Sequence, residues 1–299
     1  MTRWGILGDG AIGGLFAARL ALAGYSVQLV MSKAFHQGET KRSLHYQDDQ
    51  QQVDLELTIC DHTEQCDMLL ICTKGYQVVD ALTSIRLSKH TQLITLHNGM
   101  GPQQQLVHRY PEHLIWAGTT THGAERHQNI IRHQGTGITT VGRYPSGQSE
   151  QLPPLWIMEL NAALADVVYH PHIEQALWQK LAINAIINPI TAIAQCLNGE
   201  LLTPSYQPLI RELANEIHQV AKACQIILSD SDIIQSVRQV CQHTANNHSS
   251  MAEDIRCQRQ TEIGLINGYI IRKAQEHQIE VPLNQQVVEK ILKGDCANG

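Results

Sequence analysis

The sequence Gly8-Asp9-Gly10-Ala11-Ile12-Gly13 decides the fold of the first half of this chain. It follows an apolar run at residues 4–7 that predicts a strand, and it opens a predicted helix at residues 11–23. In such a turn the first glycine permits the tight bend, the second lets backbone approach a pyrophosphate, and the third lets helix and strand pack closely. The helix N-terminus adds N–H groups and partial positive charge for phosphates. We therefore expect a dinucleotide to bind at Gly8, Asp9, Gly10, Ala11, Ile12 and Gly13.

Further apolar runs continue this pattern through the first half of the chain. They lie at residues 27–31, 68–72, 92–96 and 114–118, and the segments between them are long enough for crossover helices. This alternation predicts an α/β fold with a parallel, doubly wound, Rossmann-type sheet. Two later runs, at residues 129–133 and 138–141, flank a glycine-containing turn and predict an added hairpin.

Beyond about residue 170 the pattern becomes helical. Ile210, Leu213, Ile217, Val220 and Cys224 recur at helical spacing. Ser231 is a candidate N-cap for a second helix that runs to about residue 243, and residues 251–277 predict a third, long helix. We expect an NADP-binding domain at residues 1–170 and an all-helical substrate domain at residues 171–299, with residues 143–154 forming an exposed loop before the boundary.

Composition excludes several classes of function. The 299 residues carry a net charge of −6 and no run of Lys or Arg, which argues against nucleic acid and membrane surfaces as partners. The eight cysteines include no Cys-x-x-Cys pair, so neither zinc nor any other metal is expected. A first strand that begins at residue 4 leaves no room for a signal peptide. We expect a soluble, cytoplasmic monomer or homodimer.

The end of the second strand predicts which dinucleotide binds. NAD sites usually place Asp or Glu there, about 20 residues after the glycine turn, to hold the ribose 2′-hydroxyl. This chain instead has Ser32 and Lys33. A hydroxyl and a cation favour the 2′-phosphate of NADP, although Lys33 is also compatible with a solvated loop.

A polar stripe marks the second half of the chain. Lys180, Asn184 and Asn188 are spaced at i, i+4 and i+8, so one face of a helix carries all three within an otherwise apolar segment. Buried polar groups cost several kcal/mol unless they are hydrogen-bonded or line a cleft, so the stripe is either a satisfied network or a site. Pro189 should bend or end that helix just past Asn188.

These residue types suit the reduction of a ketone. The developing alkoxide must receive a proton, and a Lys ammonium whose pKa is lowered by burial can donate one. Asn184 and Asn188 can hold hydroxyl or carboxylate oxygens of a substrate. A carboxylate that orients Lys180 would complete the arrangement, and the spacing does not identify it.

The whole set of motifs resembles the ketopantoate (2-dehydropantoate) reductase family. Besides the glycine turn and residues 178–189, the resemblance is carried in order by Cys72-Thr73-Lys74, His97-Asn98-Gly99-Met100-Gly101, Thr119-Thr120-Thr121-His122, Leu197-Asn198-Gly199-Glu200, residues 249–255 and Thr261-Glu262-Ile263. It implies that NADPH reduces ketopantoate, a small 2-keto acid, to pantoate on the route to pantothenate and coenzyme A.

The resemblance also implies residue roles. Lys180 would be the proton donor, and Glu262 would close the cleft as a second catalytic and cofactor-contacting residue. Asn98 would lie between nicotinamide and substrate, and Lys74 and the Gly123 backbone would line the cofactor site. The residues implied to contact substrate are Asn184, Asn188, Asn198 and Ser250. Ser250 is also a candidate N-cap, and Asn198-Gly199 a candidate helix cap.

Two departures and two alternatives accompany this resemblance. The family often has Arg where this chain has Ser32, and Leu-Gln where it has Ala252-Glu253. One alternative is an NADP-dependent dehydrogenase of another small 2-keto or 3-hydroxy acid. Residues 97–101 and 119–122 argue against the 3-hydroxy acid. The other is a non-catalytic dinucleotide sensor, which has no need of Lys180 and Glu262.

Overall fold

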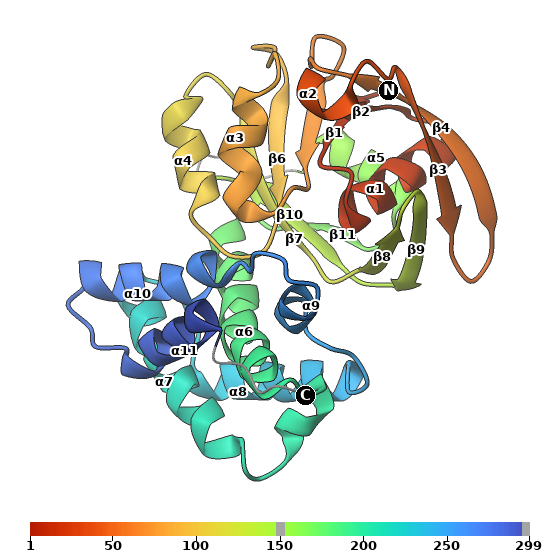
Figure 1. The fold of residues 1–299 in the computed structure, drawn as a ribbon. Helices are drawn as coiled ribbons and strands as arrows, with labels where there is room; N and C mark the ends of the chain where they lie inside the picture. The colour runs from red at the N-terminus through yellow and green to blue at the C-terminus, as the bar shows by residue number, and fades with distance from the viewer. Residues whose placement is uncertain (148–152, 295–299) are drawn as a thin grey trace. The chain divides into compact units, whose positions relative to one another are not determined.

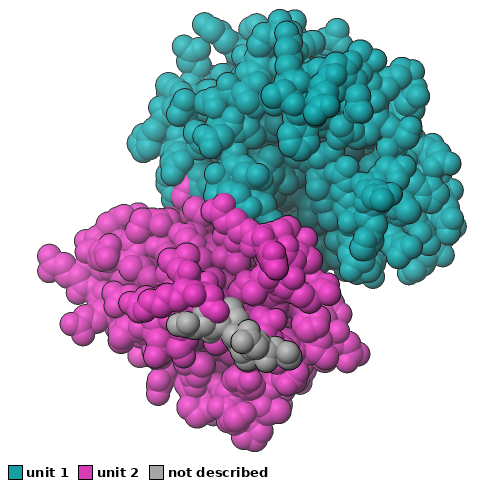
Figure 2. Space-filling view, in the orientation of Figure 1, with its two compact units in different colours: residues 1–97, 102–176 teal, residues 98–101, 177–299 magenta. Residues whose placement is uncertain are grey.

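The computed structural model describes residues 1–147 and 153–294 and divides into two compact units, coloured separately in Figure 2. Unit 1 comprises Met1–His97 and Pro102–Ala176, and unit 2 comprises Asn98–Gly101 and Leu177–Gly299. The division after Ala176 falls a little beyond the boundary expected after residue 170. The loop Asn98–Gly101 belongs to unit 2, although the sequence boundaries placed it in the first domain.

Unit 1 is built on one eleven-stranded mixed sheet of order β11-β10-β7-β6-β5-β1-β2-β4-β3-β9-β8 (Figure 1). The strands are β1 (Arg3–Leu7), β2 (Ser26–Val30), β3 (Lys41–Gln47), β4 (Gln52–Cys60), β5 (Met68–Ile71), β6 (Gln92–Leu96), β7 (Ile115–Thr120), β8 (Gly123–His127), β9 (Ile130–Gly135), β10 (Thr139–Arg143) and β11 (Val167–Tyr169). Strands β1, β2, β5, β6 and β7 run parallel, which confirms the predicted Rossmann-type core.

The helices of unit 1 follow from this strand order. They are α1 (Ala11–Leu22), α2 (Lys33–His36), α3 (Val78–Thr83), α4 (Pro102–Arg109) and α5 (Leu155–Ala163), with the 3₁₀ turn η1 (Gly75–Gln77). The chain steps outward from β1 to β2 in one direction and from β5 to β7 in the other. Right-handed crossovers therefore place α1 and α3 on opposite faces of the sheet. Trp156 of α5 packs edge-on against Trp4 and Trp116, with ring centroids 6.1 and 5.1 Å apart, and anchors the core on the α1 face.

The added strands differ from the prediction. Residues of β9 and β10 do not form a hairpin with each other: β9 pairs with β8 and with β3, and β10 pairs with β7 and β11. The segment between β2 and β5 forms the antiparallel pair β3–β4 rather than a crossover helix. Alternating buried and exposed residues in β3 explain this outcome, because a strand covered on one face needs apolar residues only at every second position.

The described residues of unit 2 form helices joined by turns and loops, with no strand among them, as expected. Its elements are α6 (Ile173–Ala194, which begins in unit 1), η2 (Asn198–Leu202), α7 (Gln207–Ala223), α8 (Asp230–His243), α9 (Ser250–Arg256), η3 (Ile263–Leu265), α10 (Asn267–Glu276) and α11 (Pro282–Lys293). The amphipathic α7 buries Ile210, Leu213, Ile217 and Val220, which confirms the helix predicted from their spacing.

Two helix predictions were wrong in detail. The N-cap of α8 is Ser229 rather than Ser231. The Ser229 hydroxyl accepts a hydrogen bond from the Asp232 N–H, and the Asp232 carboxylate accepts one from the Ser229 N–H. The long helix expected at residues 251–277 is instead α9, η3 and α10. Gln258, which follows the C-cap Cys257, takes a left-handed conformation with φ of 54° that ends α9.

Candidate active site

The glycine turn of unit 1 has the geometry that a bound pyrophosphate requires. Gly8 has a φ of +101°, and a Cβ there would lie 2.7 Å from the Thr73 backbone nitrogen. A Cβ on Gly13 would lie 1.8 Å from the Gly8 carbonyl oxygen, so both positions demand glycine for the chain's own packing. Gly10 differs, since no heavy atom lies within 4 Å of a Cβ built there. The open space beside Gly10 fits a ligand that approaches the backbone closely.

The start of α1 is available to an anion. Gly10 is its N-cap and supplies no side-chain oxygen, and the first turn of α1 contains no acidic residue. Its first N–H groups therefore keep their partial positive charge for a phosphate.

Two arginines that the sequence prediction did not identify lie beside this turn. The Asp9 carboxylate forms salt bridges with Arg42 of β3 and with Arg126 of β8, the latter at 3.0 Å. Arg42 also pairs with Glu39 at 3.0 Å. An unpaired carboxylate in the middle of the turn would repel phosphates, so the two guanidinium groups offset its charge. Both lie on strands that the sequence patterns did not predict.

The residues expected at the 2′-phosphate lie where β2 ends. Ser32 is the N-cap of the short α2, and Lys33 is its first residue. The Lys33 side chain is 77% exposed, and its ammonium lies 3.6 Å from a carboxylate oxygen of Asp61. Asp61 also binds Arg86 at 3.0 Å, and that hydrogen bond is the main reason why its pKa is lowered.

Lys74 and Gly123 belong to well-separated parts of the same sheet, at β5 and at the edge strand β8. Lys74 follows β5, which pairs with β1, so it lies at the same sheet edge as the glycine turn. Gly123 begins β8, opposite Gly135 of β9, at an irregularity in the strand register.

In unit 2, the polar stripe lies along α6 as its spacing predicts. Lys180 and Asn184 are half-buried and Asn188 is buried. Burial lowers the pKa of Lys180 to about 8, and the nearby Glu262 carboxylate opposes that shift because it favours the ammonium form. Lys180 is therefore able to exchange a proton in the neutral to mildly alkaline range.

Glu262 is the carboxylate that the sequence spacing could not identify. It is 5% exposed and accepts a hydrogen bond of 3.1 Å from Nδ2 of Asn98. The loop that carries Asn98 is held by the bond from Met100 N–H to the Leu265 carbonyl, at 2.9 Å. Gly99 is required there, since its φ is +76° and a Cβ would lie 2.5 Å from the same carbonyl oxygen. Asn98, Glu262 and Lys180 are thus brought together.

Asn198 offers an acceptor to a ligand. It is buried, its Nδ2 donates to Thr244 Oγ1 at 2.9 Å, and its Oδ1 has no hydrogen-bond partner among the described residues. A buried oxygen without a donor costs free energy that a bound hydroxyl would recover.

Ser250 does not cap α9. That cap is Ser249, whose hydroxyl accepts from the Ala252 N–H at 3.1 Å, while Ser250 is exposed in the first helical position. The nearby Glu253 forms a salt bridge of 2.6 Å with Arg256 in the same helix, so its charge is already compensated.

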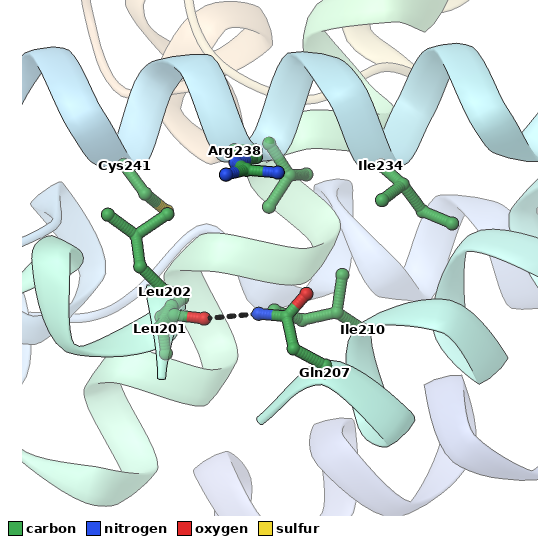
Figure 3. Close-up of a pocket in the computed structure, with 8 residues that line it drawn as sticks. Leu201, Leu202, Gln207, Ile210, Ile234, Arg238 and Cys241 are labelled. Atoms are coloured by element: carbon green, nitrogen blue, oxygen red, sulfur yellow. Dashed lines mark hydrogen bonds between the residues drawn. The ribbon is translucent and has the colours of Figure 1, made fainter. Parts of the chain in front are cut away.

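The small pocket in Figure 3 is not this site. It lies among η2, α7 and α8, is lined mainly by Leu201, Leu202, Ile210, Ile234 and Val237, and has a volume of about 10 Å³. That is room for about one water molecule. Figure 3 also shows Gln207, which lines the pocket, donating to the Leu201 carbonyl in a bond of 2.9 Å.

Neither a metal site nor a membrane span is found in the part of the chain that the structure describes. Across residues 1–147 and 153–294, no three His, Cys, Asp or Glu side chains are grouped so that they could hold an ion. Within those same residues, no helix is both long and apolar enough to cross a bilayer.

Comparison with known proteins covers nearly the whole chain. Residues 4–146 match the family model "Ketopantoate reductase PanE/ApbA", and residues 172–293 match "Ketopantoate reductase PanE/ApbA C terminal". The chain is 36% identical over 291 residues to the 2-dehydropantoate 2-reductase of Vibrio cholerae serotype O1, covering 96% of this chain and 95% of that protein.

Solved structures share the fold. A D-mandelate dehydrogenase with NADH and anilino(oxo)acetate is 23% identical, with a TM-score of 0.88 and coverage of 98% of both chains. A PanE/ApbA family ketopantoate reductase from Ralstonia eutropha JMP134 is 23% identical, with a TM-score of 0.85 and coverage of 97% of both chains. At this identity the likeness concerns the fold.

Proposed function

Because this chain belongs to the ketopantoate reductase PanE/ApbA family, we propose that it reduces 2-dehydropantoate to pantoate with NADPH, a step toward pantothenate and coenzyme A. The observation that carries the proposal is the electrostatic interaction of Lys180 with the Glu262 carboxylate in unit 2, together with a Lys180 pKa of about 8. A non-catalytic sensor would have no use for an ammonium whose pKa is lowered to about 8 beside a carboxylate.

Lys180 is the proton donor in this mechanism. The reduced nicotinamide, when bound, supplies a hydride to the keto carbon. As the C=O π bond opens, the electron pair moves to oxygen, and the Lys180 ammonium gives that oxygen a proton and becomes an amine. Glu262 keeps Lys180 protonated before the transfer and then favours its reprotonation from water.

The other polar residues orient the substrate. Asn184 and Asn188 lie one and two helical turns from Lys180 and can bind the hydroxyl and carboxylate of ketopantoate. Asn198 offers its unpaired Oδ1 to the substrate hydroxyl, and Ser250 offers a hydroxyl at the start of α9. Asn98, held by Glu262, contacts both the nicotinamide and the substrate in this proposal.

The cofactor is NADPH in this proposal. Gly8, Asp9, Gly10, Ala11, Ile12 and Gly13 bind the pyrophosphate, Lys74, Gly123 and Glu262 contribute further cofactor contacts, and Ser32 and Lys33 bind the 2′-phosphate. The absence of an acid at the end of β2 supports this choice. Arg42 is a further candidate, since its guanidinium lies beside the same turn.

A binding titration tests the choice of cofactor. We expect NADPH to bind at least about tenfold more tightly than NADH, since a phosphate held by a cation forms a charge-assisted hydrogen bond. Lys33→Ala should weaken the binding of NADPH and leave the affinity for NADH unchanged. Lys222→Ala, on the exposed face of α7, is the control. Equal affinities for the two dinucleotides in the native protein would contradict the assignment.

A substrate panel tests the reaction itself. NADPH oxidation is followed at 340 nm with ketopantoate, pyruvate, 2-ketoisovalerate and phenylglyoxylate as substrates. We expect the highest kcat/KM with ketopantoate. NADP reduction with 3-hydroxyisobutyrate measures the 3-hydroxy acid alternative in the reverse direction. A higher kcat/KM for one of the other acids would show that this acid, rather than ketopantoate, is the preferred substrate. Absence of turnover with all of these acids would favour the hypothesis that the protein is a non-catalytic dinucleotide sensor.

A further inference from the structure

The helix that carries Lys180 contains a break in its own hydrogen bonding. Pro189 lies inside α6, and proline has no N–H to donate to the carbonyl four residues earlier, which is that of Ala185. Ala185 is fully buried, so water cannot satisfy this oxygen. The interrupted turn lies between Asn184 and Asn188, the two residues that the proposed function places on the substrate.

A side chain from another helix supplies the missing donor. Nδ2 of Asn267, at the start of α10, donates to the Ala185 carbonyl at 2.8 Å. The same Nδ2 donates to Oδ1 of Asn284 in α11 at 3.0 Å. Asn267 and Asn284 are both 0% exposed, so neither amide exchanges these partners for water.

The direction of this chain of bonds is fixed at its far end. The Glu216 carboxylate of α7 accepts from the backbone N–H groups of Leu283 and Asn284, at 2.9 and 3.0 Å. It also accepts from Nδ2 of Asn284 at 2.8 Å. Because a carboxylate only accepts, the Asn284 amide must turn its NH₂ toward Glu216 and its oxygen toward Asn267. Asn267 must then present its own NH₂ to Asn284 and to Ala185.

We propose that Glu216, Asn284 and Asn267 form a relay that holds α6 at its proline break and thereby sets the positions of Asn184 and Asn188. Asn267 is a positioning residue, since it acts on the substrate contacts through the Ala185 carbonyl. Turning its amide over would set Oδ1 against two oxygens, so the relay has one stable arrangement. The link to substrate rests on the proposed function.

A double-mutant cycle tests the relay. Pro189→Ala restores a backbone N–H that can donate to the Ala185 carbonyl, so it removes the need for Asn267 there. We expect Asn267→Leu, which has a similar shape and no donor, to raise KM for ketopantoate about tenfold while dinucleotide affinity stays unchanged. In the Pro189→Ala background the same substitution should raise KM less than about threefold. An equal rise in both backgrounds, or none in either, would overturn the proposal.

Stability provides a readout that does not depend on the substrate. Asn267→Leu should lower the urea midpoint in both backgrounds, because Asn284 Oδ1 loses its donor in each. The fall should be larger with Pro189 present, because only then is the Ala185 carbonyl also left without a donor. Equal falls would reject the relay even if ketopantoate reduction stands. A larger fall with Pro189 present would support it even if another acid is the substrate, and a larger fall with Pro189→Ala would contradict it.

A second variant keeps the test available if Asn267→Leu does not fold. Asn284→Ala leaves the bond from Asn267 to Ala185 in place but removes the oxygen that orients the Asn267 amide. It should raise KM by a smaller factor than Asn267→Leu, and Pro189→Ala should abolish that rise. A rise that persists unchanged beside Pro189→Ala would contradict the relay.

Discussion

The glycine turn of unit 1 and the polar stripe of α6 prepare their sites in opposite ways. The turn presents backbone N–H groups and open space to a ligand. Two of its residues, Gly8 and Gly13, must be glycine because a Cβ there would clash with the chain's own atoms. The stripe presents side chains, and its arrangement depends on groups distant in sequence, with Glu262 beside Lys180 and Asn267 behind Ala185. A backbone site is therefore specified locally, whereas the side-chain site is specified by the tertiary fold.

The largest effect is expected at the stripe. Lys180→Ala removes the proton donor and should lower kcat by roughly 10²–10⁴. Dinucleotide affinity should stay nearly intact, because the phosphates are assigned to unit 1. Steady-state rates and calorimetric titration measure the two quantities, with Lys222→Ala as the exposed control. Turnover close to that of the native protein would show that another group protonates the product.

The turn allows a matched pair of substitutions. Gly13→Ala places a methyl group 1.8 Å from the Gly8 carbonyl oxygen, so unit 1 should lose about 1–3 kcal/mol of stability. Gly10→Ala meets no atom within 4 Å and has a φ of −64°, so stability should change by less than about 1 kcal/mol.

Dinucleotide binding separates the two variants further. Gly10→Ala should still weaken the binding of NADPH about tenfold or more, since its methyl group would occupy the space into which the pyrophosphate binds. Thermal unfolding and calorimetric titration distinguish loss of fold from loss of ligand. NADPH binding at native affinity by Gly10→Ala would mean that the pyrophosphate lies elsewhere.

This contrast explains how much could be predicted from sequence. The turn and the core strands were predictable because strand, glycines and helix are contiguous and their pattern is local. The stripe was predictable as a helix face, but its spacing could not identify its partners, since Glu262 and Asn267 lie far along the chain from Lys180. The family resemblance implied Glu262, and no sequence signal pointed to Asn267. Strands β3 and β8, which carry Arg42 and Arg126, were missed because their patterns are short and mostly polar. The break after α9 depends on a left-handed Gln258, for which the sequence carries no glycine signal.

The smallest effect concerns two histidines near the added strands of unit 1. His122 Nδ1 and His133 Nε2 lie 3.2 Å apart, and burial lowers the pKa of both, with mutual repulsion adding to the effect on His122. The unfolded chain then binds protons more readily than the folded one. The free energy of unfolding should therefore be at its full value above about pH 6.5 and should decrease as the pH falls below it.

Urea unfolding at several pH values measures this decline. His133→Gln should make it shallower, because His122 then has no cationic neighbour at that contact. His127→Gln, at an exposed position of β8, is the control. A decline equally steep in His133→Gln would show that other groups cause the acid sensitivity.

The pH dependence of kcat/KM for ketopantoate, compared between the native protein and Glu262→Gln, tests the central claim most directly. The ammonium of Lys180 is needed for proton transfer, so kcat/KM should fall as the pH rises through about 8. Glu262→Gln keeps an acceptor for Asn98 but removes the charge that raises the Lys180 pKa, so the fall should begin at lower pH. A descending limb that stays at the same pH in Glu262→Gln would contradict the claim that Glu262 tunes Lys180 as the acid of this reaction.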